Sequence, residues 1–195
     1  MRILFLGPSD SPLLSLFDDG DAITRTNLPL TLDLLDAIDP EWTVSYGYRH
    51  LLQGKILDRV KDHAINLHVS LLPWNRGADP NLWSFIDNTP KGVSIHYIDK
   101  GIDTGDLIAR MLVQPEAGDT LRTSYERLHT AIQTMFLVRW PDIRTGTAKR
   151  YRQPAGGSYH STADRARIEL PDGWDTPVAS LRAGVQSRGM AGVIR

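Results

Sequence analysis

Residues 65–108 read INLHVSLLPWNRGADPNLWSFIDNTPKGVSIHYIDKGIDTGDLI, and the rest of the chain is arranged around this stretch. Asn66 and His68 stand two positions apart at the end of a short apolar run, and Asp103 lies in the turn of residues 101–105 (GIDTG). An amide, an imidazole and a carboxylate can together accept a proton, return it and stabilise an oxyanion. These residue types therefore suit an acyl-transfer site.

A strand over residues 64–67 would bring Asn66 and His68 together, because alternate side chains of a strand point to the same face. They would lie at its carboxyl end, the edge at which open α/β sheets bind ligands. Asp103 lies far along the chain, so only the fold can bring its carboxylate to the pair. Each residue also has an ordinary structural explanation: a packed or surface histidine, a turn aspartate, and an asparagine that caps a strand. Spacing alone leaves both interpretations open.

The first 68 residues alternate between strand-like and helix-like segments. Strands are predicted at residues 2–6, 22–26, 42–46 and 64–67, and helices at residues 9–17, 28–38 and 51–61. This alternation predicts an α/β fold with a Rossmann-like, doubly wound and mostly parallel sheet. The turn after the first strand, residues 7–10 (GPSD), lacks the further glycines of a dinucleotide-binding fingerprint.

In the second half of the chain, strands and helices are predicted to alternate less regularly. A short helix is expected at residues 80–86, with Pro80 in its first turn, and strands at 92–98 and 107–113 flank the turn that carries Asp103. The longest helix is predicted at residues 120–143 from an apolar stripe at helical spacing. A further short helix is expected at residues 178–186, and residues 189–195 look frayed. We expect a catalytic domain over residues 1–147 and an extension over residues 148–195 that packs on it rather than folding by itself.

Several motifs in this chain occur together in a characteristic order: Asn-x-His-x-Ser-Leu-Leu-Pro, Arg-Gly, Gly-Val-Ser-Ile-His and Gly-Ile-Asp-Thr-Gly-Asp. They resemble the family of formyltransferases that use 10-formyltetrahydrofolate, which includes methionyl-tRNA, glycinamide-ribonucleotide and amino-sugar formyltransferases. The resemblance covers roughly residues 1–160, and several ordered motifs are more specific than one short pattern. It implies the formyltransferase fold, with an N-terminal half shortened by one strand–helix unit.

The activity that this resemblance implies is transfer of a formyl group from N10 of the folate to a primary amine. Asn66 would donate an N–H to the tetrahedral oxyanion. His68 would transfer protons, or share in stabilising the oxyanion when protonated. Asp103 would orient His68 or an ordered water and favour the imidazolium. No metal is expected, because the histidines show no ligand spacing with carboxylates or cysteines.

The co-substrate, 10-formyltetrahydrofolate, should lie in the crevice beside the strand ends. By resemblance, the backbone around His50, Leu51 and Leu52 would meet the pterin, and the loop that contains Asp99 and Ile102 would close over its other side. Leu51 and Leu52 could equally serve as ordinary core residues, because recognition through backbone groups leaves little trace in side-chain identity.

The acceptor amine is indicated by the loop at residues 73–83. This loop resembles the nucleotide-sugar N-formyltransferases and also the formylation domains that begin some nonribosomal peptide synthetases. Arg76 would pair with a phosphate, Trp74 or Trp83 would stack on a base or sugar, and His96 would lie near the acceptor. The alternatives are that both tryptophans pack within the protein and that His96 is a half-buried strand histidine.

These features predict an N-formyltransferase that acts on a nucleotide-linked amino sugar. An aminoacyl group on a peptidyl carrier protein is the alternative acceptor, since its arm also bears a phosphate. A non-catalytic protein that binds folate or a nucleotide sugar is a further alternative, against which the presence of Asn66, His68 and Asp103 together argues. A transfer-RNA acceptor is not expected, because the chain has no room for the further RNA-binding domain of those enzymes.

Composition narrows the class of protein further. The 22 basic and 23 acidic residues give a net charge of −1, so there is no general attraction to nucleic acid or to anionic membranes. There is no cysteine for a disulfide or a thiolate site. No apolar run approaches the roughly 20 residues of a membrane span, and the apolar start is too short for a signal peptide. We expect a cytoplasmic protein with no membrane or nucleic-acid partner, and leave a homodimer open.

Overall fold

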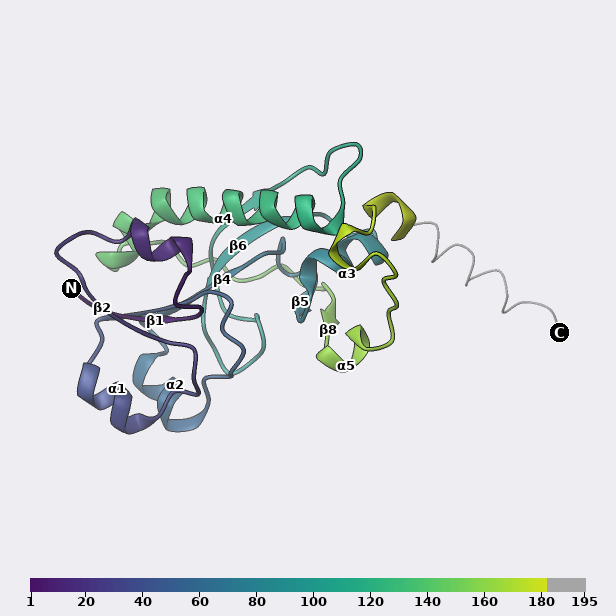
Figure 1. The fold of residues 1–195 in the computed structure, drawn as a ribbon. Coiled ribbons are helices and arrows are strands. Elements are labelled where there is room, and N and C mark those ends of the chain that lie inside the picture. Colours follow the sequence, from purple (N-terminus) through teal and green to yellow (C-terminus); the bar gives the residue numbers. More distant parts are fainter. Residues whose placement is uncertain (182–195) are drawn as a thin grey trace.

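A six-stranded sheet forms the centre of the structure, a computed structural model that describes residues 1–181 (Figure 1). Its strands, in spatial order, are β2 (Ala22–Thr26), β1 (Arg2–Leu6), β3 (Trp42–Ser45), β4 (Ala64–His68), β6 (Gly92–Tyr97) and β7 (Leu107–Leu112). The first four run parallel, whereas β6 is antiparallel to both β4 and β7. The prediction of a mostly parallel α/β sheet is confirmed.

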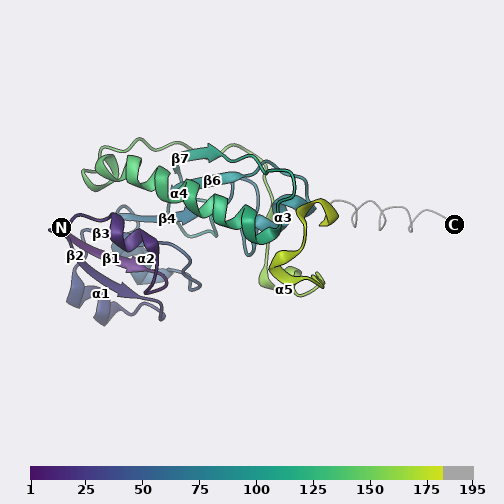
Figure 2. The same cartoon turned by 45° about the horizontal axis from the view of Figure 1, so that its top comes forward.

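Helices cover both faces of this sheet (Figure 1). On one face, α1 (Leu32–Ile38) and α2 (Gly54–Val60) pack on a cluster of buried aliphatic side chains from β1 and β4. On the other face, the 3₁₀ helix η1 (Pro12–Leu16) and the long helix α4 (Leu121–Arg144) cover the larger core, and α4 runs along β4, β6 and β7 (Figure 2). The doubly wound arrangement follows from burial of both faces of a parallel sheet.

The helix α4 is built on signals that are local in the sequence. The Thr120 hydroxyl accepts the backbone N–H of Thr123, and the Thr123 hydroxyl accepts the N–H of Thr120, which makes a reciprocal cap. Its buried face then presents Leu128, Ile132 and Phe136 to the sheet. No helix in the described part of the chain combines the length and the apolar character that a membrane crossing would require.

The segment after α4 returns to the middle of the chain. The short strand β8 (Tyr159–His160) pairs in parallel with β5 (Arg76–Gly77) to form a second, two-stranded sheet. Three more helices lie in this region: α3 (Pro80–Ile86), α5 (Thr162–Arg165) and the 3₁₀ helix η2 (Gly173–Asp175). Val178 packs with residues of α3 and α4 in a third apolar cluster. These contacts tie residues 148–181 to the sheet-bearing part, although the division into two regions remains a prediction.

Several predicted helices are shorter in the structure. The helix predicted at residues 28–38 begins at Leu32, because Pro29 disfavours helical geometry in the residue before it and Thr31 caps the start. The helix predicted at 9–17 is only η1, a short 3₁₀ turn whose N-cap Ser11 makes no side-chain cap hydrogen bond. The helix predicted at 51–61 begins at Gly54. Residues 178–181 are helical as predicted, and residues 182–186 and 189–195 lie outside the described part.

We predict that Phe136→Ala lowers the free energy of unfolding by about 3–5 kcal/mol, because the ring is fully buried between α4 and the sheet and its removal leaves a cavity. The neighbouring Leu137 is 54% exposed, so Leu137→Ala should change the free energy by roughly 0.5 kcal/mol or less. Urea denaturation of both variants measures the difference. Equal effects would show that α4 does not pack as described.

Candidate active site

The two faces of β4 have different partners. Ile65 and Leu67 point into the core beneath α4, so the alternating side chains of Asn66 and His68 point to the opposite face. On the neighbouring strand β6, His96 pairs in register with Asn66 and shares this face. The sheet therefore gathers an amide and two imidazoles on one surface.

Asp103 joins these side chains from the loop between β6 and β7. The Nδ2 of Asn66 donates to its Oδ1 at 3.1 Å. The Nδ1 of His68 lies 3.6 Å from its Oδ2, and the Nε2 of His96 lies 3.4 Å from its Oδ1. The structure thus brings Asn66, His68 and Asp103 together, with His96 as a fourth member. Three polar side chains therefore meet around the carboxylate of Asp103.

The backbone conformation around Asp103 directs its side chain toward Asn66, His68 and His96. Asp103 has φ = 53°, in the left-handed region. The carboxylate of Asp99 accepts the N–H of Gly101 and the hydroxyl of Thr104, which closes the turn. Gly105 is required at its position, because an added Cβ would come within 1.8 Å of the carbonyl oxygen of Tyr97. In addition, the backbone N–H of Gly77 donates to Oδ2 of Asp103 at 2.8 Å.

The His68 ring is held on both sides. Its Nε2 donates to the backbone carbonyl of Asn75 at 3.0 Å, so Nδ1 is the nitrogen that faces Asp103. Asn75 is itself fixed: it is fully buried, its amide donates to Thr89, and its side-chain oxygen accepts from Ser158. The imidazole is therefore oriented with one nitrogen turned toward the carboxylate, as a proton-transfer group requires.

The side-chain amide of Asn66 already has partners for its donors. Besides Asp103, its Nδ2 contacts the Nε2 of His96 at 3.3 Å. The Nδ1 of His96 donates to the carbonyl of Tyr97 at 2.8 Å, which turns Nε2 toward Asn66 and Asp103. To donate to a substrate oxyanion, Asn66 would have to give up one of these two contacts. The contact to His96 is the longer and weaker of the two, so it would be the one given up.

The electrostatics of the cluster favour an ionised carboxylate. Burial raises the pKa of Asp103, but the positive charge that His68 carries when protonated, the hydrogen bond and charge that His96 supplies when protonated, and the Gly77 N–H outweigh burial. Together they hold the pKa of Asp103 well below its usual range. Asp103 is therefore an anion at neutral pH, able to orient an imidazole and to stabilise positive charge on it.

The predicted folate-binding residues are distributed between surface and core. His50 is exposed with its ring against Tyr48, and Leu51 is 58% exposed. Leu52 is buried in the cluster under α1 and α2, which is the ordinary packing alternative. Asp99 and Ile102 lie half-buried in the loop that carries Asp103. Their contact with a folate stays a prediction.

The predicted acceptor-binding residues also differ in availability. Trp74 is 37% exposed, whereas Trp83 is 7% exposed and one face of its ring is stacked on His160, with centroids 3.9 Å apart. The Nη2 of Arg76 donates to Oε1 of Gln153 at 2.9 Å, and its buried Nε has no hydrogen-bond partner among the described residues. Trp74 and Arg76 are the better placed of the three to meet a ligand.

Two residues that hold the site were not anticipated from the sequence. Asn75 receives His68 through its backbone carbonyl, and Gln153 donates its side-chain N–H groups to the carbonyls of Asp103 and Gly105, each at 2.8 Å. The only sequence signal for either was position: Asn75 lies in the loop after β4, and Gln153 lies in the segment that resembles the family.

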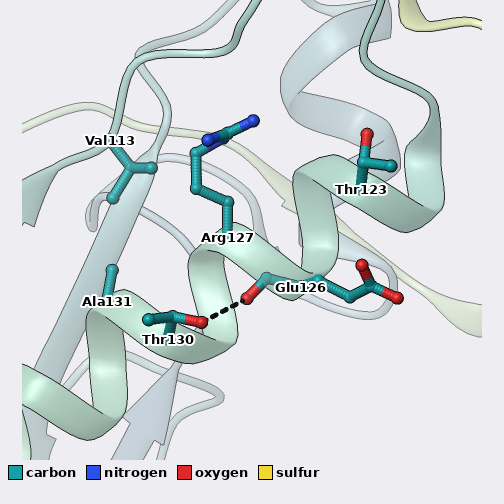
Figure 3. Close-up of a pocket in the computed structure, with 6 residues that line it drawn as sticks. All are labelled: Val113, Thr123, Glu126, Arg127, Thr130 and Ala131. Carbon is teal, nitrogen blue, oxygen red and sulfur yellow. Dashed lines mark hydrogen bonds between the residues drawn. The ribbon is translucent and has the colours of Figure 1, made fainter.

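A hollow of about 510 Å³ lies away from these side chains, along the exposed side of α4 (Figure 3). It is lined by Val113, Thr123, Glu126, Arg127, Thr130 and Ala131. None of the candidate catalytic residues lines it, so this hollow and the polar cluster are separate features. Among the described residues, no group of three or more histidine, aspartate or glutamate side chains is arranged to hold a metal ion.

Comparisons with known proteins agree on one family, the formyltransferases. A family described as Formyl transferase matches residues 22–139. The crystal structure of the formyltransferase PseJ from Anoxybacillus kamchatkensis, in complex with UDP-4,6-dideoxy-4-formamido-L-AltNAc and tetrahydrofolate, is 45% identical. That match covers 95% of this chain and 100% of the other, with a TM-score of 0.90.

Two methionyl-tRNA formyltransferases are similar over shorter stretches. The protein from Finegoldia magna is 40% identical over 92 residues, which are 46% of this chain and 30% of that protein. The protein from Bacillus licheniformis is 30% identical over 146 residues, 74% of this chain and 46% of that protein. The chain therefore spans less than half the length of these curated relatives.

The lowered pKa of Asp103 predicts how stability depends on pH. Its folded-state pKa lies below the unfolded value of about 3.9, so the ionised carboxylate stabilises the fold above that value, and this stabilisation is lost as pH falls through the folded-state pKa. The melting temperature of Asp103→Asn should lie below that of wild type at about pH 5, and the difference should narrow steadily as pH is lowered from about 4 to about 2. Thermal melts across this range measure the difference. Parallel curves would contradict the proposed electrostatics.

Proposed function

The chain belongs to the formyl transferase family, and from that premise we propose that it transfers the formyl group of 10-formyltetrahydrofolate to a primary amine of a nucleotide-linked amino sugar. The observation that carries this proposal is the likeness to PseJ, because it extends over nearly the whole of both chains. The gathering of Asn66 and His68 around the carboxylate of Asp103 supports the same chemistry.

The ligands of PseJ suggest the acceptor. A 4-formamido sugar is what N-formylation of a 4-amino sugar produces, and tetrahydrofolate is what remains of the donor. The acceptor that we propose for this chain is accordingly a UDP-linked 4-amino-4,6-dideoxy hexose. Arg76 would meet its diphosphate, since a buried guanidinium nitrogen without a partner can be satisfied by an anion, and Trp74 offers an exposed ring for stacking.

The reaction requires one group transfer and one proton transfer. The neutral amine nitrogen attacks the formyl carbon, a carbon–nitrogen bond forms, and the carbonyl oxygen becomes an oxyanion that the Asn66 amide stabilises. The amine then loses a proton to His68, the bond between carbon and N10 breaks, and N10 takes up a proton. Because His68 Nε2 is held by the Asn75 carbonyl, Nδ1 is the nitrogen that accepts and returns this proton.

Asp103 serves this cycle without changing its own charge. When His68 takes the proton, the positive imidazolium lies beside a carboxylate that is already ionised. The carboxylate therefore stabilises the protonated intermediate state relative to the neutral one. His96 shares the same carboxylate and would hold Asn66 in place until the oxyanion forms.

One other acceptor, transfer RNA, is favoured by a particular observation. Two similar proteins are methionyl-tRNA formyltransferases, which makes a transfer-RNA acceptor an alternative, although the net charge of −1 provides no general attraction to RNA. An aminoacyl carrier protein and a non-catalytic binding role also remain as alternatives. A cytoplasmic location and a homodimer stay predictions.

We predict that His68→Ala lowers kcat about 10²- to 10⁴-fold and that Asn66→Ala lowers it about 10²- to 10³-fold, because one removes the proton-transfer group and the other an oxyanion donor. The KM for the sugar nucleotide should change little in either variant. The control is His63→Ala, an exposed histidine outside the cluster. Activity of His68→Ala equal to that of the control would refute the role given to His68.

We predict that, with 10-formyltetrahydrofolate, the protein formylates a UDP-linked 4-amino-4,6-dideoxy hexose and neither an aminoacyl carrier protein nor methionyl-tRNA. Mass spectrometry of each acceptor measures the gain of one carbon monoxide unit. If only the carrier protein or only methionyl-tRNA is formylated, that macromolecule is the acceptor and the proposed sugar acceptor is wrong. Binding of the sugar nucleotide with no product would favour the non-catalytic role.

A further inference from the structure

We propose that Gln153 is a positioning residue that fixes the carboxylate of Asp103 in the site, an inference that rests on the catalytic role proposed for Asp103. Its side-chain Nε2 donates to the carbonyl oxygens of Asp103 and Gly105, both at 2.8 Å. Gln153 touches neither of the two histidines by any hydrogen bond that the structure describes. Its contact with the catalytic cluster is therefore made through the backbone of the Asp103 loop.

The two carbonyls that Gln153 holds lie directly after the left-handed φ torsion of Asp103, which directs the catalytic side chain. Asp103 has φ = 53°, a conformation that residues with a Cβ adopt rarely and that surrounding contacts must maintain. One amide nitrogen with two hydrogen atoms holds both carbonyls at the exit from this bend. A side chain without donors at position 153 would leave both carbonyls without this partner.

The position of Gln153 is itself fixed by backbone hydrogen bonds on both sides. Before it, Tyr151 and Leu107 exchange a pair at 2.7 Å and 2.9 Å. After it, the carbonyl of Ser158 accepts the N–H of Arg76 at 3.0 Å, next to the β5–β8 pairing. The amide of Gln153 is thus presented to the Asp103 loop by a segment anchored at β7 and at β5.

The side-chain oxygen of Gln153 connects the same residue to the proposed acceptor side. It accepts from Nη2 of Arg76 at 2.9 Å. The adjacent residue Gly77 donates its backbone N–H to Oδ2 of Asp103 at 2.8 Å. Gln153 therefore holds the main chain of Asp103, and the N–H of Gly77 in β5 holds the Asp103 carboxylate. Through its hydrogen bond with Arg76, Gln153 also connects to β5.

Two substitutions separate these contacts. Gln153→Met keeps the length of the side chain but removes the donors and the acceptor, whereas Gln153→Glu keeps an acceptor for Arg76 and replaces the donors by a carboxylate oxygen. We expect both to lower kcat roughly 10- to 100-fold, because the reacting groups would be misplaced. The KM for either substrate should change little in Gln153→Glu, which keeps a partner for Arg76, whereas Gln153→Met removes that partner and should also raise the KM for the sugar nucleotide. The matched controls are Gln114→Met and Gln114→Glu at an exposed position.

Amide hydrogen exchange measured by NMR provides a readout that does not require activity. The N–H of Gly77 reports on the carboxylate of Asp103, whereas its neighbours Arg76 and Ala78 donate to the carbonyls of Ser158 and His160 in the β5–β8 ladder. In both Gln153 variants, the exchange of the Gly77 amide should accelerate and that of Arg76 and Ala78 should stay as in wild type. A general loosening of the region would accelerate all three.

The results separate this proposal from the proposed function. Wild-type kcat in Gln153→Glu, a loss of activity confined to Gln153→Met, or equal acceleration of all three amides would each overturn the positioning role. If wild type formylates no acceptor, the proposed function fails, and the Gly77 amide alone then decides the positioning of Asp103. If Gln153→Met does not fold, Gln153→Glu supplies both measurements.

Discussion

A carboxylate withdrawn from water is the constraint on which the rest of this structure depends. The side chain of Asp103 is only 11% exposed, and a buried ion destabilises a fold by several kcal/mol unless charges and hydrogen bonds replace its hydration. The replacements come from separate segments: Asn66 and His68 on β4, His96 on β6, and the N–H of Gly77 in β5. The carboxylate can be buried only once these segments have assembled around it.

This dependence joins the stability of the fold to the chemistry of the site. The backbone is left-handed at Asn75, Asp79 and Asp103, which lie in the two loops that face the polar cluster. Such conformations persist only where surrounding contacts hold them, and they concentrate at functional sites. Here the hydrogen bonds from Asn66 and Gly77 compensate the buried charge and also set the direction of the Asp103 carboxylate, and the carbonyl of Asn75 turns the His68 ring toward it. A change that relieves the strain would therefore disturb the site as well.

The sequence predicts most of the fold, because the deciding signals are local. The bounds of β1, β2 and α3 agree with the prediction, and the apolar stripe of α4 identifies the longest helix. The site is predicted less completely. Asn66, His68 and Asp103 have reactive side chains in ordered motifs, so they can be recognised as candidates. The contributions of Asn75 and Gly77 are made by backbone atoms, which any residue possesses, and the contribution of Gln153 depends on where the segment after α4 returns.

The position of the loop that carries Asp103, and of the site with it, follows from the direction of one strand, β6. Because β6 runs antiparallel to β4, His96 lies directly across from Asn66, on the face away from α4. The loop that follows β6 begins with Ile98 packed against the cluster under α1 and α2, so it turns over this same face and delivers Asp103 to both strands. A parallel crossover would have consumed a helix at this point and carried the loop away from its partners. The antiparallel end of the sheet thus converts two neighbouring strands and one glycine-rich turn into a closed polar cluster.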